Sequence, residues 1–307
     1  MGLSHDEVRN LSHLNPTSCH YVLMAVVPAR GRTGRDVASA LKSALNELGR
    51  VRGGGGTPDQ VMGHYIEWAT TQARLLQTCI SGRAVEELIL TRSFYSLLDN
   101  STGSAPRGFP LLSGELAARE AALSSELDAL NQAIGRWNDY LPLVVLDTNV
   151  YLHAPTEFTS LNLWPHVESD TWHILILIAV VDELDRAKDT ASRAIAHGTE
   201  LVRDRARRTL RTLEELIDGP DQVVKLSGSS SVVEIVLDPP RHTRLARADD
   251  EIVDRAAAIS AIAGRDVHLV SYDTGMQMRA RGAGLFPHKP TPEVDASPGA
   301  VDSTLSG

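Results

Sequence analysis

Apolar side chains in the first 140 residues recur every three or four positions, which is the spacing of helices that bury one face. Four stretches carry this period, at residues 36–48, 60–80, 83–98 and 113–137. No Gly-Lys-Ser/Thr follows the glycine run at 53–56, so this run favours a hinge over a phosphate loop. The scattered histidines are interpreted as packed or solvated side chains. Residues 1–140 are therefore predicted to form a mostly helical domain.

From residue 141 the pattern changes to short apolar runs separated by helical stretches. Strands are predicted at 143–146, 174–178, 232–237 and 267–270, and helices at 180–188, 194–217 and 249–263. Strands that are apolar on both faces and alternate with helices predict a parallel sheet covered on both sides, an α/β fold. The Pro-, Ser- and Gly-rich stretch 291–307 predicts a disordered tail. The domains are therefore expected at 1–140, 141–290 and 291–307.

Composition and charge narrow the class of protein. Hydrophobic residues make up 42% of the chain and charged residues 22%, as in globular proteins. The net charge of −9 argues against a protein that coats nucleic acid through charge alone, although a local basic strip beside an acidic metal site is compatible with it. Two cysteines, a polar amino terminus and no long apolar run favour a reduced cytoplasmic protein without a membrane segment.

Acidic residues lie where each predicted strand gives way to the next segment. They are Asp147, Glu183, Asp250 and Asp273. A single Asp at a strand end is often only a helix cap, but the carboxyl ends of parallel strands meet at one edge of a sheet. The mutual repulsion of clustered carboxylates is costly unless a cation offsets it, and oxygen ligands select Mg²⁺ or Mn²⁺ over Zn²⁺. The pattern thus predicts a divalent metal site.

Four segments, in order along the chain, resemble the acidic motifs of the PIN-domain nucleases. They are LVVLDTNVYLH at 143–153, VVDELDRAK at 180–188, ADDEIVDRAA at 248–257 and LVSYDTGMQMRAR at 269–281. The resemblance implies a three-layer α/β/α fold with a central parallel sheet, preceded by the helical domain. It assigns the second acid to Glu183, and it favours Asp250 over Asp249 because two apolar residues follow Asp250 at the expected positions; Asp249 is then interpreted as a helix cap.

The same resemblance implies a function for this half of the chain. It implies hydrolysis of RNA phosphodiester bonds by an ion-activated water, with Asp147, Glu183, Asp250 and Asp273 holding one or two ions of Mg²⁺ or Mn²⁺. Asp254, one helical turn after Asp250, would complete a second ion site. Thr148 and Asn149 would orient Asp147 and the substrate, and Ser271 or Thr274 would assist Asp273.

Two groups of arginines are candidates for contacting a phosphate backbone. Arg203, Arg207 and Arg211 share one helical face, which is also interpretable as a solvated face paired with nearby acids. Arg241, Arg244 and Arg247 come just before the third acidic motif. This second group is favoured because it is closer to the predicted metal site.

Other functions stay open on the sequence alone. A ribonuclease of this kind would act as the toxin of a toxin–antitoxin pair or as a processing enzyme, and the large helical half argues against a plain toxin. A DNA-acting flap-type nuclease and a catalytically silent scaffold with the same fold are the alternatives. A phosphoaspartate receiver is disfavoured because the lysine expected after its last strand is absent. Beyond RNA, the sequence leaves open a homodimer and a protein partner bound through the helical half.

Overall fold

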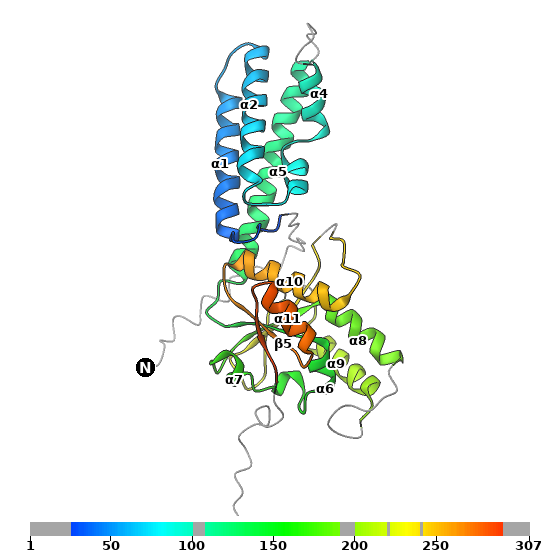
Figure 1. The fold of residues 1–307 in the computed structure, drawn as a ribbon. Coiled ribbons are helices and arrows are strands. Elements are labelled where there is room, and N and C mark those ends of the chain that lie inside the picture. Colours follow the sequence, from blue (N-terminus) through cyan, green and yellow to red (C-terminus); the bar gives the residue numbers. More distant parts are fainter. Residues whose placement is uncertain (1–25, 101–107, 191–199, 220–221, 240–241, 291–307) are drawn as a thin grey trace, which may run out of the picture.

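A computed structural model describes residues 26–100, 108–190, 200–219, 222–239 and 242–290. The predicted tail at 291–307 lies outside these residues. Figure 1 shows long helices standing side by side on top of an α/β body. Among the residues described, no helix is both long and apolar enough to cross a membrane.

The amino-terminal half is helical, as predicted. Its helices are α1 (Gly34–Gly53), α2 (Pro58–Leu76), α3 (Gly82–Leu88), α4 (Arg92–Asn100) and α5 (Gly108–Arg136). Thr33 and Thr57 begin α1 and α2 with capping boxes, in which each threonine side chain accepts from a backbone amide three residues on. The glycines at 55 and 56, both at positive φ, form the turn between these helices.

Two helix boundaries in this half differ from the prediction. The single helix expected at 83–98 is two helices, because the Thr91 hydroxyl accepts from the Phe94 amide and caps α4. The same hydroxyl donates to the buried Glu115 at 2.8 Å, which ties the break to α5. Helix α5 begins at Gly108, five residues before the helical stretch expected at 113–137.

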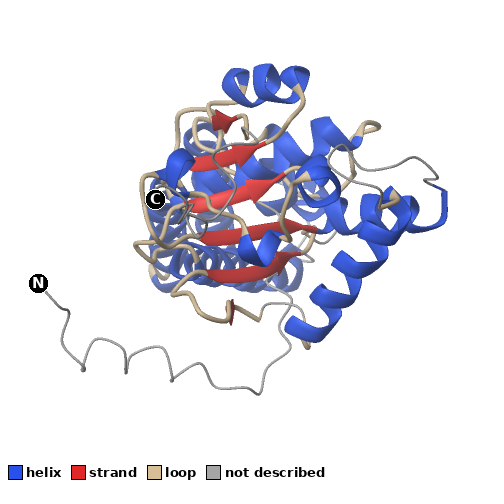
Figure 2. Cartoon of the chain, turned by 90° about the horizontal axis from the view of Figure 1, so that it is seen from below, coloured by secondary structure: helices blue, strands red, loops and turns tan. Residues whose placement is uncertain are grey.

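The carboxyl-terminal half has a six-stranded sheet in the order β3-β4-β2-β1-β5-β6, seen from below in Figure 2. Its strands are β1 (Leu143–Leu146), β2 (His173–Leu177), β3 (Val224–Lys225), β4 (Val232–Val236), β5 (Val267–Val270) and β6 (Phe286–His288). Its helices are α6 (Thr148–His153), α7 (Trp164–Val167), α8 (Ile178–Thr190), α9 (Val202–Leu216), α10 (Ala248–Ala263) and α11 (Thr274–Gly282), with a 3₁₀ turn at Phe158–Ser160.

Four neighbouring strand pairs are parallel, which confirms the predicted α/β class. The short strand β3 runs antiparallel to β4 at one edge, and β6 closes the other edge. Both edge strands are too short to carry a hydrophobic pattern, so the sequence did not reveal them. Strand β1 is buried along its whole length at the centre of the sheet. Its carboxyl end therefore meets the ends of β2 and β5, where the predicted acids lie.

The two halves share one hydrophobic core and meet closely at α10. Gly34 begins α1 so near to α10 that a Cβ atom there would lie 2.3 Å from the carbonyl oxygen of Ile262. Arg265, just after α10, donates to the backbone carbonyls of Trp137, Asp139 and Leu141. Arg265 of the carboxyl-terminal half therefore holds the segment that connects the two halves.

A buried ionic group lies at the same junction. Glu234 of β4 is fully buried; its carboxylate pairs with Arg136, accepts from the Trp137 indole at 2.7 Å and lies 3.3 Å from His173. His173 also bonds Asp139 at 3.0 Å. Burial lowers the pKa of His173, but hydrogen bonds to Asp139 and Glu234 outweigh it and raise the pKa to about 9. The group therefore joins the end of α5 to the sheet through charged contacts.

Candidate functional site

Asp147 lies at the carboxyl end of β1 and is 2% exposed. It occupies the position before α6 but makes no side-chain capping bond to that helix. Its carboxylate instead accepts from the Ser271 hydroxyl at 2.7 Å and from the Asn149 amide at 3.4 Å. A cap would have used the carboxylate on its own helix, so the reading of Asp147 as a simple cap does not hold.

The environment of Asp147 opposes ionisation. Burial raises the pKa of this carboxyl group, and the negative charges of Asp249 and Glu183 raise it further. The hydrogen bonds from Ser271 and Asn149 act in the opposite direction without cancelling the effect. The charges of Glu183 on α8 and Asp249 on α10 thus act on Asp147 at one edge of the sheet, a repulsion that a bound cation would offset.

Glu183 comes from α8, directly after β2. Its carboxylate accepts from the Thr148 hydroxyl at 2.6 Å. Thr148 is the residue after Asp147, so one short segment after β1 fixes two acids: Asn149 bonds the first and Thr148 the second.

Asp249 and Asp250 lie in the first turn of α10, and Arg279 of α11 pairs with both. Its guanidinium lies 2.7 Å from Asp249 and 3.2 Å from Asp250. The residue in the capping position is Arg247, so Asp249 is not the helix cap that the sequence suggested. Because the charge of Asp249 raises the Asp147 pKa, Asp249 is the member of the pair that the structure ties to the centre. The assignment of Asp250 as a ligand stays a prediction.

Asp273 follows β5 and does cap a helix. Its Oδ1 accepts from the Met276 amide at 2.7 Å, and its own amide donates to Ser271 at 3.0 Å. Ser271 is fully buried and donates in turn to Asp147. The serine therefore links the ends of β1 and β5 and positions both acids, while Asp273 and Thr274 are exposed.

The comparison with protein families bears on this group of acids. Residues 144–286 match the model of the PIN domain, a range that includes all four predicted acids. This half of the chain is a PIN domain. No curated protein and no solved structure matches the chain. The PIN domain is a nuclease-type fold.

The other predicted site residues have different surroundings. Asp254 is exposed one turn along α10 and lines a cleft that faces the helical half. Arg244 pairs with Asp182 and Asp238, and Arg247 lies 3.6 Å from Asp249. Arg241 lies outside the described residues.

The arginine stripe of α9 is partly neutralised within its own helix. Arg203 and Arg207 lie 3.7 and 3.4 Å from Asp204, which favours a solvated, ion-paired face. The neighbouring Arg205 is buried and donates to the backbone carbonyls of Tyr151, Ala154 and Thr156. It fixes the segment after α6 to α9, a structural role that the sequence did not reveal.

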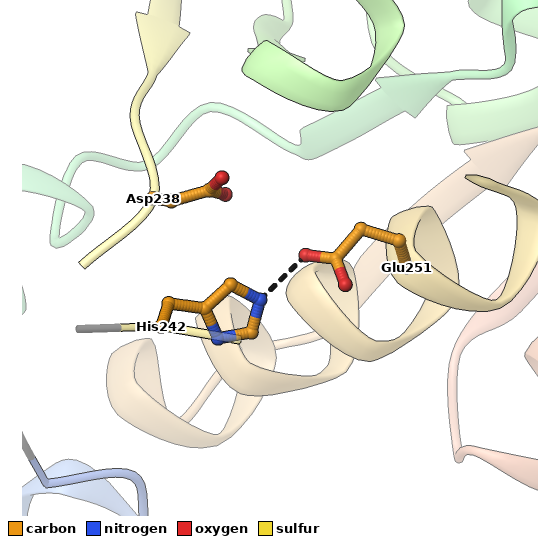
Figure 3. A group of neighbouring side chains, drawn as sticks. All are labelled: Asp238, His242 and Glu251. Atoms are coloured by element: carbon orange, nitrogen blue, oxygen red, sulfur yellow. Dashed lines mark hydrogen bonds and ion pairs between the residues drawn. The ribbon is translucent and has the colours of Figure 1, made fainter. Parts of the chain in front are cut away.

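A second group with metal-ligating side chains lies beside the PIN-domain acids. The ligand atoms of Asp238, His242 and Glu251 all lie within 4.8 Å of one another. Figure 3 shows His242 pointing at Glu251 with Asp238 facing them from the end of β4, and the imidazole lies 2.6 Å from the Glu251 carboxylate. Glu251 is buried and also accepts from the Leu245 amide, while Asp238 pairs with Arg244.

This second group is better explained as an anchor than as a metal centre. The guanidinium of Arg244 already neutralises Asp238, and the buried Arg255 lies 4.0 Å from it. Both guanidinium groups compete with a cation for the Asp238 carboxylate, and the His242 nitrogen that faces Glu251 is already used in the bond between them. The bonds of Glu251 to His242 and Leu245 instead hold the segment before α10 against that helix. Arg244 belongs to this segment and pairs with Asp182 of α8.

Proposed function

We propose that the PIN domain hydrolyses phosphodiester bonds of single-stranded RNA with Mg²⁺ or Mn²⁺. The observation that carries the proposal is the buried carboxyl group of Asp147, whose pKa is raised by burial and by the charges of Asp249 and Glu183. Acidic side chains that repel one another in a folded protein are typical of sites where a bound cation offsets the repulsion.

The residues present fit a hard divalent cation. Asp147, Glu183, Asp249 and Asp273 offer carboxylate oxygens, the atoms that Mg²⁺ and Mn²⁺ prefer. We propose that they hold the ion, with Asp250 and Asp254 as candidates for a second position. When bound, such an ion polarises a phosphate oxygen and makes water a better nucleophile.

The remaining side chains position these acids. Ser271 and Asn149 set the orientation of Asp147, and Thr148 sets that of Glu183. Arg279 holds Asp249 from the α11 side. These hydrogen bonds and ion pairs restrict the orientation of the acidic side chains, so the site is preorganised for its ligand. Arg247, whose side chain is 65% exposed beside Asp249, is a candidate to contact a substrate phosphate.

The first test compares RNA and DNA under controlled metal. Purified full-length protein is incubated with labelled 20-nucleotide single strands of RNA or DNA. We expect cleavage of the RNA with Mn²⁺ or Mg²⁺, none after EDTA treatment, and recovery when the metal is added back. Cleavage that persists in EDTA would contradict the metal-dependent mechanism. Cleavage of DNA alone indicates a DNA nuclease, and binding of RNA without cleavage indicates a scaffold.

A second prediction concerns Thr148. Thr148→Val keeps the shape of this buried side chain but removes the hydroxyl that donates to Glu183. We expect RNA cleavage to fall by about 10- to 100-fold, as for other residues that orient metal ligands, and half-maximal activity to require a higher concentration of Mn²⁺. Thr148→Ser retains the hydroxyl and should keep most of the activity. Equal losses in the two variants would show that packing, and not the hydrogen bond, is what matters there.

A further inference from the structure

A cleft of about 780 Å³ lies between the helical half and α10. One wall is formed by residues 27–32 and by the start of α3, and the other by α10 and the segment before it. Figure 1 shows the same arrangement, with α10 lying beneath the lower ends of the long helices. The cleft therefore exists only because the two halves are joined.

Guanidinium groups from the helical half line one wall of this cleft. Arg30 and Arg83 are exposed there, and Arg83 is 74% exposed although it pairs with Glu87 one turn on. Arg32 is held in place by its bond to the Thr78 carbonyl. The acids on the walls are Glu87 and Asp254, so the arginines outnumber them in a protein whose net charge is −9. Positive charge gathered in a concave surface attracts an anionic chain.

The cleft leads away from the PIN-domain acids. Its α10 wall runs from Asp254 to Ala261, whereas Asp249 lies in the first turn of the same helix. At 1.5 Å per residue, this wall lies between about 8 and about 18 Å from Asp249 along the helix axis. A stacked strand advances roughly 3.4 Å per nucleotide, so the wall has room for about three nucleotides beyond the acids.

We propose that this cleft holds the part of a single-stranded nucleic acid that extends beyond the cleaved bond. Arg30, Arg32 and Arg83 contact its phosphates, so the helical half contributes to substrate binding. The inference rests on the proposed nuclease function, because it takes the acids of the PIN domain as the place where the strand is cleaved. Because of the helical half, the protein should then bind long strands more tightly than short ones.

The experiment compares two double variants that remove the same charge. Arg30→Gln/Arg83→Gln acts in the cleft, and Lys42→Gln/Arg50→Gln removes two exposed cations from α1 outside it. Binding of a labelled 20-nucleotide single strand is measured by fluorescence anisotropy in EDTA over a range of salt concentrations. We expect the cleft variant to bind about tenfold more weakly, and its salt dependence to fall by about 1.4 in slope because two phosphate contacts are lost. The control should bind like the wild type.

Cleavage of two substrate lengths completes the test. The cleft variant should cleave the 20-nucleotide strand with a raised KM and cleave a dinucleotide at the wild-type rate, since the dinucleotide does not reach the cleft. Equal binding of the long strand by both variants, or no binding by the wild type, would overturn the proposal. Arginine-dependent binding of polyglutamate in place of nucleic acid would also overturn it, in favour of an acidic protein partner. Arginine-dependent binding of the strand without any cleavage would leave the cleft assignment standing and contradict the proposed nuclease function alone.

Discussion

Asp147→Asn is expected to slow RNA cleavage by at least about a thousandfold and, in the absence of metal, to make the protein more stable. The loss of activity follows from removing one charged oxygen ligand at the centre of the acidic group, where electrostatic groups have large effects on rate. The gain in stability follows from the raised pKa of Asp147, which has burial as its largest cause. The variant keeps an oxygen that can accept from Ser271.

The sign of the stability change can be worked out from that pKa. An acid whose pKa is higher in the folded state than in the unfolded state lowers the free energy of unfolding once it ionises. At neutral pH the wild type therefore carries a cost that the asparagine does not. The difference should vanish as the pH falls through the raised pKa, where Asp147 takes up a proton.

Urea denaturation in EDTA, and again with Mn²⁺ in excess, measures the stability of the two proteins. The RNA cleavage assay measures their activity. Mn²⁺ should stabilise the wild type and have little effect on Asp147→Asn. Asp218→Asn, at an exposed position, serves as the control and should match the wild type in cleavage and stability. A variant that cleaves at the wild-type rate would refute the role of Asp147, whereas an inactive variant with lowered stability would point to a structural one.

Glu234→Gln is expected to lower the free energy of unfolding by about 3 kcal/mol, because it leaves the buried His173 and the half-buried Arg136 without their partner. Burial raises the pKa of Glu234, but the hydrogen bond to His173 and the charge of Arg136 outweigh it, so the pKa is lowered overall. The substitution removes the negative charge from between these two cations. The exposed Glu86→Gln is the matched control and should change stability little.

The same group predicts a pH dependence. The pKa of His173 is about 9 in the folded protein against 6.5 for an ordinary histidine. Its contribution to stability is therefore complete below about pH 6.5 and is lost as the pH rises through 9. In Glu234→Gln this loss should be smaller, because one of the two acids that raise the pKa is gone. Urea midpoints at pH 6, 8 and 10 test this, and an identical pH profile in both proteins would contradict it.

The sequence predicted the elements with a strong period and the edge of the sheet where the acids meet. Its preference for Asp250 over Asp249 rested on the motif alone, because adjacent residues on a helix point about 100° apart and the rotation of α10 against the sheet depends on packing. Arg279 holds both acids from another helix, and nothing in the local pattern connects it to them. The His242–Glu251 bond escaped prediction for a related reason: its partners lie nine residues apart, across a non-helical segment.

The close contact of Gly34 with Ile262 has a consequence for how the protein unfolds. The start of α1 packs directly against the end of α10. Arg265 donates to carbonyls of the segment that connects the two halves. Neither half can open without exposing apolar surface and backbone carbonyls of the other to water. The helical half therefore behaves as part of one cooperative unit and not as a detachable appendage, so heat or urea should melt both halves in a single transition.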